Sequence, residues 1–294
     1  MFFKNKYLYV LLSVLAVISC SDNSVDPGNP PELPIHYVSI DIDDIFMPNW
    51  DSSTQKNGTV KMTSDDVKAL IKLSYDIRSR FNDDFRFSIG FNCGYFDSTN
   101  SGDSAFLTFN KEFLWFDHLV HHNLIKSDQL PEDKIDKLFA VGRQFAQTQG
   151  IQITDYQITP KHEGIWPPYD PLYNVFEKYG IKYTSTFELH TQASYGNVKI
   201  LPRYYIGVGS GSYSLSQISQ DRLKKFAEDD YKTIMENRAV ILYSHQANFA
   251  VDRLGEKLIR ILMEKLSEQK AFRIVFLPAG EVVRIIHEQS LTTH

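Results

Sequence analysis

The sequence predicts an α/β protein in which parallel strands, joined by helical crossovers, form a closed or nearly closed barrel in a single domain. Apolar strand-like runs alternate with amphipathic helical segments almost to the end of the 294 residues. The number of these units favours a barrel over an open sheet. The sequence contains no internal repeat and no indication of a second domain.

Six segments have the apolar spacing of amphipathic helices. Thr63 or Ser64 can cap the first, which runs to about Phe81 with acidic residues in its first turn. Pro131 begins the second helix and Gly150 ends it. The other four are expected near residues 171–179, 220–237, 254–269 and 281–289.

Six apolar runs are expected to form strands, near residues 38–43, 85–91, 156–159, 182–187, 239–244 and 273–277. The first run ends at Asp43 and Asp44, and the fifth is followed by His245. Active sites of parallel barrels gather at the carboxyl ends of the strands. These three residues therefore indicate where the chemistry of the protein takes place.

The first residues have the pattern of an export signal. Lys4 and Lys6 precede an apolar stretch that is too short to span a bilayer, and residues 17–20 read Val-Ile-Ser-Cys, which is similar to a lipobox. We expect residues 1–19 to be a lipoprotein signal peptide and Cys20 to carry the lipid, with an ordinary signal peptide or an uncleaved anchor as the alternatives. Residues 20–34 are polar and rich in Pro, Gly, Asp and Asn, which predicts a flexible tether. The folded domain is expected at residues 35–294, held to a membrane in the bacterial cell envelope.

Composition limits the possible partners. The formal net charge of −5 becomes −7 without Lys4 and Lys6, and no run of basic residues is present, so nucleic acid is not expected as a partner. Cys93 is the only cysteine besides Cys20, so no disulfide is expected inside the domain. The 20 Phe, 16 Tyr and 3 Trp suit both a packed core and loops that bind sugar rings.

The adjacent aspartates raise a geometric problem, because neighbouring residues on a strand point to opposite faces. A turn directly after Ile42 would let one of the two bind a metal while the other meets the metal-bound water. The alternative is that Asp41 and Asp43 share one face and that Asp44 caps a loop or binds a nearby cation.

His118 and His122 are four residues apart, so one helical turn would bring both rings to the same face, where they can bind Zn²⁺. Two histidines and one aspartate leave coordination positions open for water and substrate. Histidines at this spacing are also common as polar helix residues. His121 cannot share that face.

Several stretches together resemble the N-deacetylase domain of heparan sulfate N-deacetylase/N-sulfotransferases, a branch of the polysaccharide deacetylase (NodB-homology) superfamily. They occur in the same order as in the family and cover nearly all of residues 37–289: residues 40–46 (IDIDDIF), 113–118 (FLWFDH), 160–167 (PKHEGIWP), 184–186 (TST), 201–203 (LPR) and 245–255 (HQANFAVDRLG). The resemblance implies a deformed or incomplete (β/α) barrel of the deacetylase type. It also implies hydrolysis of the acetamide of N-acetylated hexosamine residues in a polysaccharide.

The resemblance also implies roles for single residues. Asp44, His118 and His122 would hold a divalent metal, for which two imidazoles favour Zn²⁺. Asp43 would be the general base and His245 the general acid. Three further residues would line the groove or support the reacting groups: His162, Trp166 and Arg203, the last by holding a carboxylate in its charged form.

The sequence departs from the family pattern at several positions. The usual Arg-x-Pro motif of the superfamily is not evident, and Asp117 stands where the animal members have a proline, so it can join or perturb the metal site. No glycine-rich phosphate loop is present, so no sulfotransferase activity is expected. Two alternatives remain. One is a glycan-binding lipoprotein without catalysis, and the other is a different hydrolase, such as an O-deacetylase or a glycosidase that pairs Asp41 with Glu163.

Overall fold

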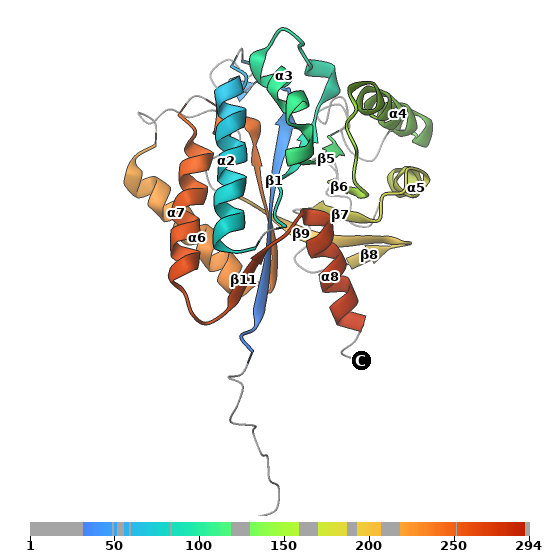
Figure 1. Cartoon of the computed structure of the whole chain (residues 1–294). Helices are drawn as coiled ribbons and strands as arrows, with labels where there is room; N and C mark the ends of the chain where they lie inside the picture. Colours follow the sequence, from blue (N-terminus) through green and yellow to red (C-terminus); the bar gives the residue numbers. More distant parts are fainter. Residues whose placement is uncertain are drawn as a thin grey trace, which may run out of the picture. The chain divides into compact units, whose positions relative to one another are not determined.

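Seven parallel strands follow one another around the sheet of the computed structural model, in the order β5-β4-β1-β10-β9-β7-β6 (Figure 1). The structure describes residues 32–48, 50–51, 56–58, 60–82, 84–118, 130–158, 170–186, 193–206, 218–250 and 252–291. In sheet order, the strands are β5 (Leu114–Asp117), β4 (Ser88–Phe91), β1 (Ile35–Ile45), β10 (Ala239–His245), β9 (Val198–Tyr205), β7 (Tyr183–Thr186) and β6 (Tyr156–Ile158).

The sheet curves round until its two edges nearly meet. Trp115 of β5 forms a parallel bridge with Ile153, just before β6, and the Thr154 backbone N–H donates to the Trp115 carbonyl at 2.9 Å. The predicted nearly closed parallel barrel is therefore confirmed. β11 (Arg273–Phe276) pairs with the first half of β1 and β4 with its second half, while β8 (Ala193–Tyr195) forms an antiparallel hairpin with β9. A separate two-stranded ribbon joins β2 (Trp50–Asp51) and β3 (Lys56–Asn57).

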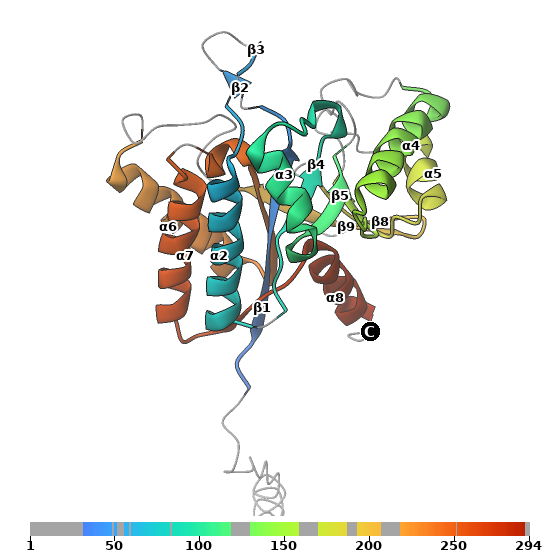
Figure 2. The same ribbon diagram turned by 45° about the horizontal axis from the view of Figure 1, so that its top comes forward.

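Helices surround the barrel. They are α2 (Ser64–Arg80), α3 (Ser101–Thr108), α4 (Glu132–Gln149), α5 (Asp170–Lys178), α6 (Gln220–Glu236), α7 (Leu254–Glu268) and α8 (Ala279–Leu291), with short 3₁₀ turns η1 (Cys93–Tyr95), η2 (Asn110–Glu112) and η3 (Gln246–Phe249). Figures 1 and 2 show α2 beside α7, and α4 beside α5. All six predicted helices are present, and Thr63 caps α2 in a capping box. Within the described residues, no helix has both the length and the apolar character to cross a membrane.

The two faces of the sheet bury different sets of residues. Val38, Ile40 and Ile42 of β1 point outward into the layer of helices. Tyr37 points inward, where the interior cluster includes Phe116, Tyr156, Leu201 and Ile241 together with Ala279, Val282 and Val283 of α8. Because Tyr37 lies near the amino end of β1, α8 closes that end of the barrel. The carboxyl end is left for polar side chains.

The short strands β2, β3 and β8 were not predicted, and neither were two strands of the barrel, β5 and β9, for each of which there is a physical reason. β5 was missed because its aromatic and acidic residues lack the alternation of a strand, and His118 was expected on a helix. β9 contains Pro202, which normally interrupts a central strand. Pro202 lies where β9 exchanges partners: residues up to Pro202 pair with β7, and Arg203 to Tyr205 pair with β10.

Candidate active site

Asp43 and Asp44 both face the barrel interior because β1 contains a bulge. Ile42 pairs with Ile89 and Ile45 pairs with Phe91, so the two aspartates oppose the single residue Gly90 of β4. Asp44 has a φ of 64°, in the left-handed region that few residues other than glycine adopt. The expected turn after Ile42 is therefore wrong. The strand continues to Ile45, and the bulge brings the two carboxylates together.

The imidazole of His118 lies between these two carboxylates. Its Nε2 is 3.7 Å from Asp43 Oδ2 and its Nδ1 is 3.7 Å from Asp44 Oδ1. The ring extends over Gly90, where an added Cβ would lie 3.0 Å from His118 Cδ2 and 2.4 Å from a ring carbon of Phe116. The absence of a side chain at Gly90 thus makes room for the ring. Gly90 was not among the predicted site residues, although a glycine inside an apolar strand often marks a close approach of another group to the backbone.

His245 completes the group from the neighbouring strand β10, in register with Asp43. Its Nδ1 lies 2.8 Å from Asp44 Oδ2. An ionised carboxylate only accepts hydrogen bonds, so the Nδ1–H donates and the Nε2 atom is left to exchange protons. The rings of Tyr205 and Tyr243 lie 5.9 and 6.1 Å from the imidazole, centroid to centroid, and add an aromatic wall.

Arg203 is the cation of the site and is buried. Its Nη1 donates to Asp43 Oδ2 at 3.1 Å, and its guanidinium lies 4.0 Å from the centre of the Tyr243 ring. Burial would raise the pKa of Asp43, but Arg203 and His118 outweigh it, so the pKa of this carboxyl lies below its usual value. Burial would lower the pKa of His118, but Asp43 and Asp44 outweigh it, so the pKa of this imidazole lies above its usual value.

A second buried carboxylate lies on the same face of β1, two residues before Asp43. Tyr156 donates to Asp41 Oδ2 at 2.5 Å and lies equally close to Ser185 Oγ. Burial, the largest influence, raises the pKa of Asp41 to about 8, and Asp43 adds to the rise. Asp41 lies deeper than Asp43, towards the end of the barrel that α8 closes, and its carboxylate accepts the hydrogen bond of Tyr156, so it lies away from the edge where a glycosidic bond would be cut. The glycosidase alternative therefore loses one of its two carboxylates.

Five residues singled out in the sequence lie outside the described part of the chain: His121, His122, His162, Glu163 and Trp166. Cys20 and residues 21–31 of the expected tether lie outside it too.

Asp117 faces away from the metal-site candidates. A Cβ at Gly142 of α4 would fall 1.8 Å from Asp117 Oδ2, so this carboxylate lies against α4 on the outer face of β5. His118, the next residue, points inward. The possibility that Asp117 joins the metal site is therefore not supported.

The side chains at the carboxyl edge suit a divalent metal. A carboxylate oxygen and an imidazole nitrogen are both ligands that Zn²⁺ accepts, and about 3.4 Å separates two ligand atoms of a tetrahedral zinc ion. The 3.7 Å between Asp44 Oδ1 and His118 Nδ1 is close to that value and too long for a hydrogen bond. Asp43 Oδ1 is buried without a hydrogen-bond partner among the described residues. Within the described residues, no three His, Cys, Asp or Glu side chains are arranged to hold a metal ion together, and the third expected ligand, His122, lies outside them.

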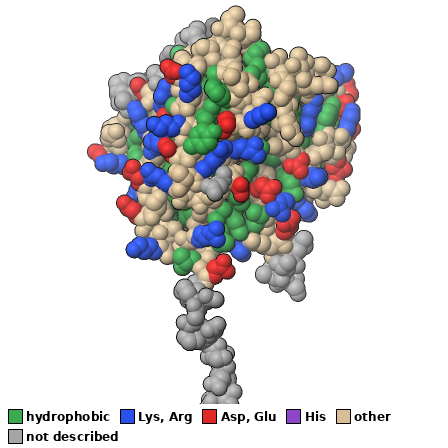
Figure 3. Space-filling view, in the orientation of Figure 1, with side chains coloured by type: hydrophobic (Ala, Val, Ile, Leu, Met, Phe, Trp, Pro, Cys, Tyr) green, Lys and Arg blue, Asp and Glu red, His purple; other side chains and the backbone are tan. Residues whose placement is uncertain are grey.

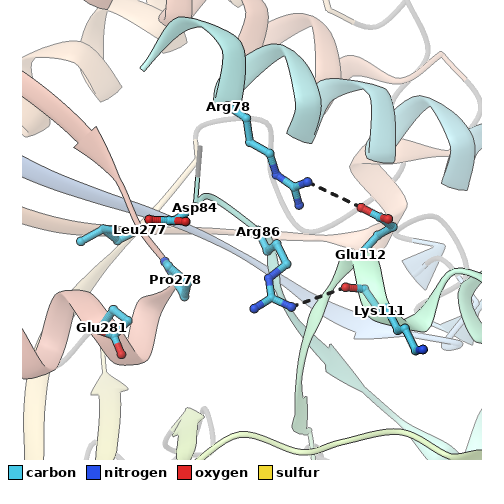
Figure 4. Close-up of a pocket in the computed structure, with 8 residues that line it drawn as sticks. All are labelled: Arg78, Asp84, Arg86, Lys111, Glu112, Leu277, Pro278 and Glu281. Carbon is cyan, nitrogen blue, oxygen red and sulfur yellow. Dashed lines mark hydrogen bonds and ion pairs between the residues drawn. The ribbon is translucent and has the colours of Figure 1, made fainter. Parts of the chain in front are cut away.

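A different pocket, of about 550 Å³, lies near the amino ends of β4 and β5 (Figure 4). Equal numbers of opposite charges line it: Arg78, Arg86 and Lys111 with Asp84, Glu112 and Glu281. Arg78 pairs with Glu112 at 3.7 Å, and Arg86 donates to the Lys111 carbonyl at 3.4 Å. The face of the molecule in Figure 3 likewise mixes Lys and Arg with Asp and Glu. The catalytic candidates are at the other end of the strands.

Comparison with solved structures agrees with this fold. A structure described as a novel carbohydrate deacetylase superposes on 88% of this chain and 54% of its own, with a TM-score of 0.65 and 11% sequence identity. An allantoinase matches 89% of this chain and 95% of its own, with a TM-score of 0.56 and 10% identity. At such low identities, these likenesses establish the deformed barrel fold and nothing more specific.

Comparison with protein sequences is more specific. The bifunctional heparan sulfate N-deacetylase/N-sulfotransferase 1 of Xenopus laevis is 30% identical over 93% of this chain and 32% of its own length. The human protein of the same name is 27% identical over 87% of this chain and 30% of its own. The chain thus spans about a third of the length of these relatives. The family model for the deacetylase domain of heparan sulfate N-deacetylase matches residues 36–210, more than half of the chain, and the protein therefore belongs to that family of deacetylase domains.

Proposed function

We propose that this protein hydrolyses the acetamide of N-acetylated hexosamine residues in a polysaccharide, with the help of a divalent metal. The observation that carries the proposal is the convergence of Asp43, Asp44, His118 and His245 at one end of a deacetylase-family barrel. The products are acetate and a free amine on the sugar.

The base of the reaction is Asp43. Its carboxylate is held in the charged form by Arg203 Nη1 at 3.1 Å, so it can take a proton from the attacking water near neutral pH. Arg203 is itself held over the face of Tyr243 and cannot swing away without losing that contact. Asp43 and Arg203 thus form a fixed pair.

The acid is His245. Its Nδ1–H bond to Asp44 fixes the orientation of the ring and leaves Nε2 directed away from that carboxylate. The Nε2–H then delivers a proton to the departing nitrogen, which is a poor leaving group unless it is protonated. The base that activates the water and the acid that protonates the leaving nitrogen therefore lie on two adjacent strands, β1 and β10.

Asp44, His118 and His122 would hold the metal. A bound divalent ion polarises the acetyl carbonyl and lowers the pKa of a water ligand. Zn²⁺ is the ion that a carboxylate and two imidazoles favour. In this arrangement Asp44 has two partners, since its second oxygen accepts the hydrogen bond of His245.

The proposal extends to location. Residues 1–19 would be removed as a lipoprotein signal, Cys20 would carry the lipid, and residues 20–34 would tether the domain to a membrane of the cell envelope. The substrate would then be a glycan of the cell surface or its surroundings. His162 and Trp166 would contribute to its binding.

The decisive experiment measures acetate release from a panel of N-acetylhexosamine polymers, including N-acetylheparosan and chitin oligomers, by a purified protein that begins at Ile35. Acetate release that matches the appearance of free amine, is lost on chelation and returns with Zn²⁺ supports the proposal. Shortened polymer chains without acetate would indicate a glycosidase. A folded, zinc-loaded protein that binds a polymer without releasing acetate would be a glycan-binding protein instead.

A further inference from the structure

Asn92 is an unusual residue at the end of β4. Its side chain is fully buried, and neither its Nδ2 nor its Oδ1 has a hydrogen-bond partner among the described residues. Buried amides are nearly always paired, because a buried polar group without a hydrogen-bond partner destabilises the folded state. Asn92 leaves both a donor and an acceptor unsatisfied, so it needs a specific explanation.

The backbone places Asn92 on the inner face of the barrel. Phe91 points outward, where its ring lies 6.1 Å from that of Trp115, and Gly90 points inward beneath His118. Asn92 is extended, with φ −115° and ψ 90°, so the alternation continues and its side chain points inward like Gly90.

The neighbours of Asn92 on that face belong to the active site. The pairing of Phe91 with Asp117 and the bond from the His118 N–H to the Phe91 carbonyl place Asn92 in register beside His118. On the other side, the Asn92 N–H donates to the Ile45 carbonyl, directly after the Asp43–Asp44 bulge. The amide is thus flanked by the strands that carry both aspartates and His118.

A local structural role does not explain the side chain. Asn92 precedes η1, where asparagine commonly caps a helical turn, yet its side chain makes no capping bond there. Asn82 shows what a structural amide does in this fold: it donates to the Phe276 carbonyl at 2.6 Å and accepts from the Phe276 N–H at 2.7 Å. Asn92 has no such partners in the described structure.

We infer that the amide of Asn92 binds the substrate, with Nδ2–H donating to the acetyl oxygen of the acetamide that is hydrolysed. A metal alone could satisfy only Oδ1, whereas an N-acetylated sugar supplies an acceptor oxygen and also N–H and hydroxyl donors. The acetyl oxygen gains negative charge during hydrolysis, so the bond strengthens at the point where it lowers the barrier. This inference rests on the proposed N-deacetylase function.

The test compares the wild type with Asn92→Leu, a substitution of similar shape that removes both polar atoms. Because an unsatisfied amide is removed, thermal unfolding of the metal-free variant should occur at the same or a higher temperature. Loss of one oxyanion donor should lower kcat on an N-acetylhexosamine polymer by about 10²–10³-fold. Calorimetry should show Zn²⁺ affinity within a few-fold of the wild type.

Asn82→Leu is the matched control, and it should lower the unfolding temperature while leaving kcat per folded molecule unchanged. The inference is overturned if Asn92→Leu is destabilised like the control, or if its lower activity follows from weaker Zn²⁺ binding. It is also overturned if both Asn92→Leu and Asn92→Ala fail to fold, since the amide would then be structural. Wild-type acetate release tests the proposed function separately, because the role of Asn92 is judged from the ratio of variant to wild type and from the unfolding temperature.

Discussion

His245 Nδ1 and Asp44 Oδ2 lie 2.8 Å apart, although the two residues are 201 positions apart in the sequence. The bond exists because β1 and β10 are parallel neighbours and because Asp44, in a left-handed conformation, turns its carboxylate inward. One carboxylate therefore serves the histidine and faces His118 as well. Changes at Asp44 and at His245 should consequently have separable effects.

Replacing His245 by Gln should lower kcat by about 10²–10⁴-fold, the usual contribution of a general acid. The Zn²⁺ affinity should change little, because His245 is not among the proposed ligands. Asp44→Asn should lower both kcat and the Zn²⁺ affinity, because Asp44 is a proposed ligand and also the partner of His245. Steady-state kinetics and zinc calorimetry on the two variants provide the check, and a His245→Gln protein with full activity would remove this residue from the mechanism.

Gly90→Ala should disturb the site through a steric clash. The new Cβ would lie 2.4 Å from the Phe116 ring and 3.0 Å from His118, so one of the rings must move. Overpacking of this kind costs about 1–3 kcal/mol of stability. The displacement of His118 should lower Zn²⁺ affinity and activity by at least about tenfold.

Gly142→Ala is the control for Gly90→Ala. Its Cβ would meet Asp117 on the outer face of β5. It should also destabilise the protein, yet activity per folded molecule should be retained. Denaturant unfolding together with activity normalised to folded protein distinguishes the two glycines, and equal activity losses would contradict the proposed role of Gly90.

Arg203→Met should shift the pH dependence of catalysis. Burial alone raises the pKa of Asp43 and Arg203 is the main influence that lowers it, so its loss should move the pKa upward. The base must be ionised, and the acid limb of kcat/KM should therefore move to higher pH by at least about one unit. Arg203→Lys keeps the charge and should move the limb less. A profile for Arg203→Met that coincides with the wild type would exclude this pairing.

Asp41 should make stability depend on pH. Burial raises its pKa from 3.8 to about 8 in the folded protein, so the folded state binds this proton more tightly than the unfolded state. The stabilisation is complete below about pH 4 and is lost as the pH rises through 8, with a slope of up to about 1.4 kcal/mol per pH unit. Asp41→Asn, which mimics the neutral acid, should flatten this slope in urea unfolding between pH 5 and 9. Parallel curves for the two proteins would show that Asp41 is already ionised.

Much of the architecture could be predicted because the pattern of residues within each segment is enough to identify that segment. The helical spacing of α2 and α4 is regular, and Thr63 and Gly150 mark ends that local chemistry alone determines. The rule that active sites lie at the carboxyl ends of strands was enough to identify Asp43, Asp44 and His245 as neighbours.

The remainder depends on contacts that a single segment does not encode. The bulge at Asp44 arises only when β4 pairs with β1, and the room for His118 arises because Gly90 lies on that partner strand. β9 was not predicted because it contains Pro202. The sheet accommodates this proline because β9 exchanges one partner strand for another at that position, which the sequence of β9 alone does not show. Asn92 carries no local signal, because burial without a partner is visible only in three dimensions.

The pairing of β1 with β10 also determines when during folding the protein acquires its activity. Joining these strands closes a loop of about two hundred residues, and the entropic cost must be met before any long-range contact compensates for it. Asp43 and Asp44 are near the start of the domain and His245 follows about two hundred residues later, so a folding chain holds an incomplete set of these groups until most of it has folded. Deacetylation would then begin late, at the final closure of the sheet, and a nascent chain would be inert towards any glycan it meets earlier.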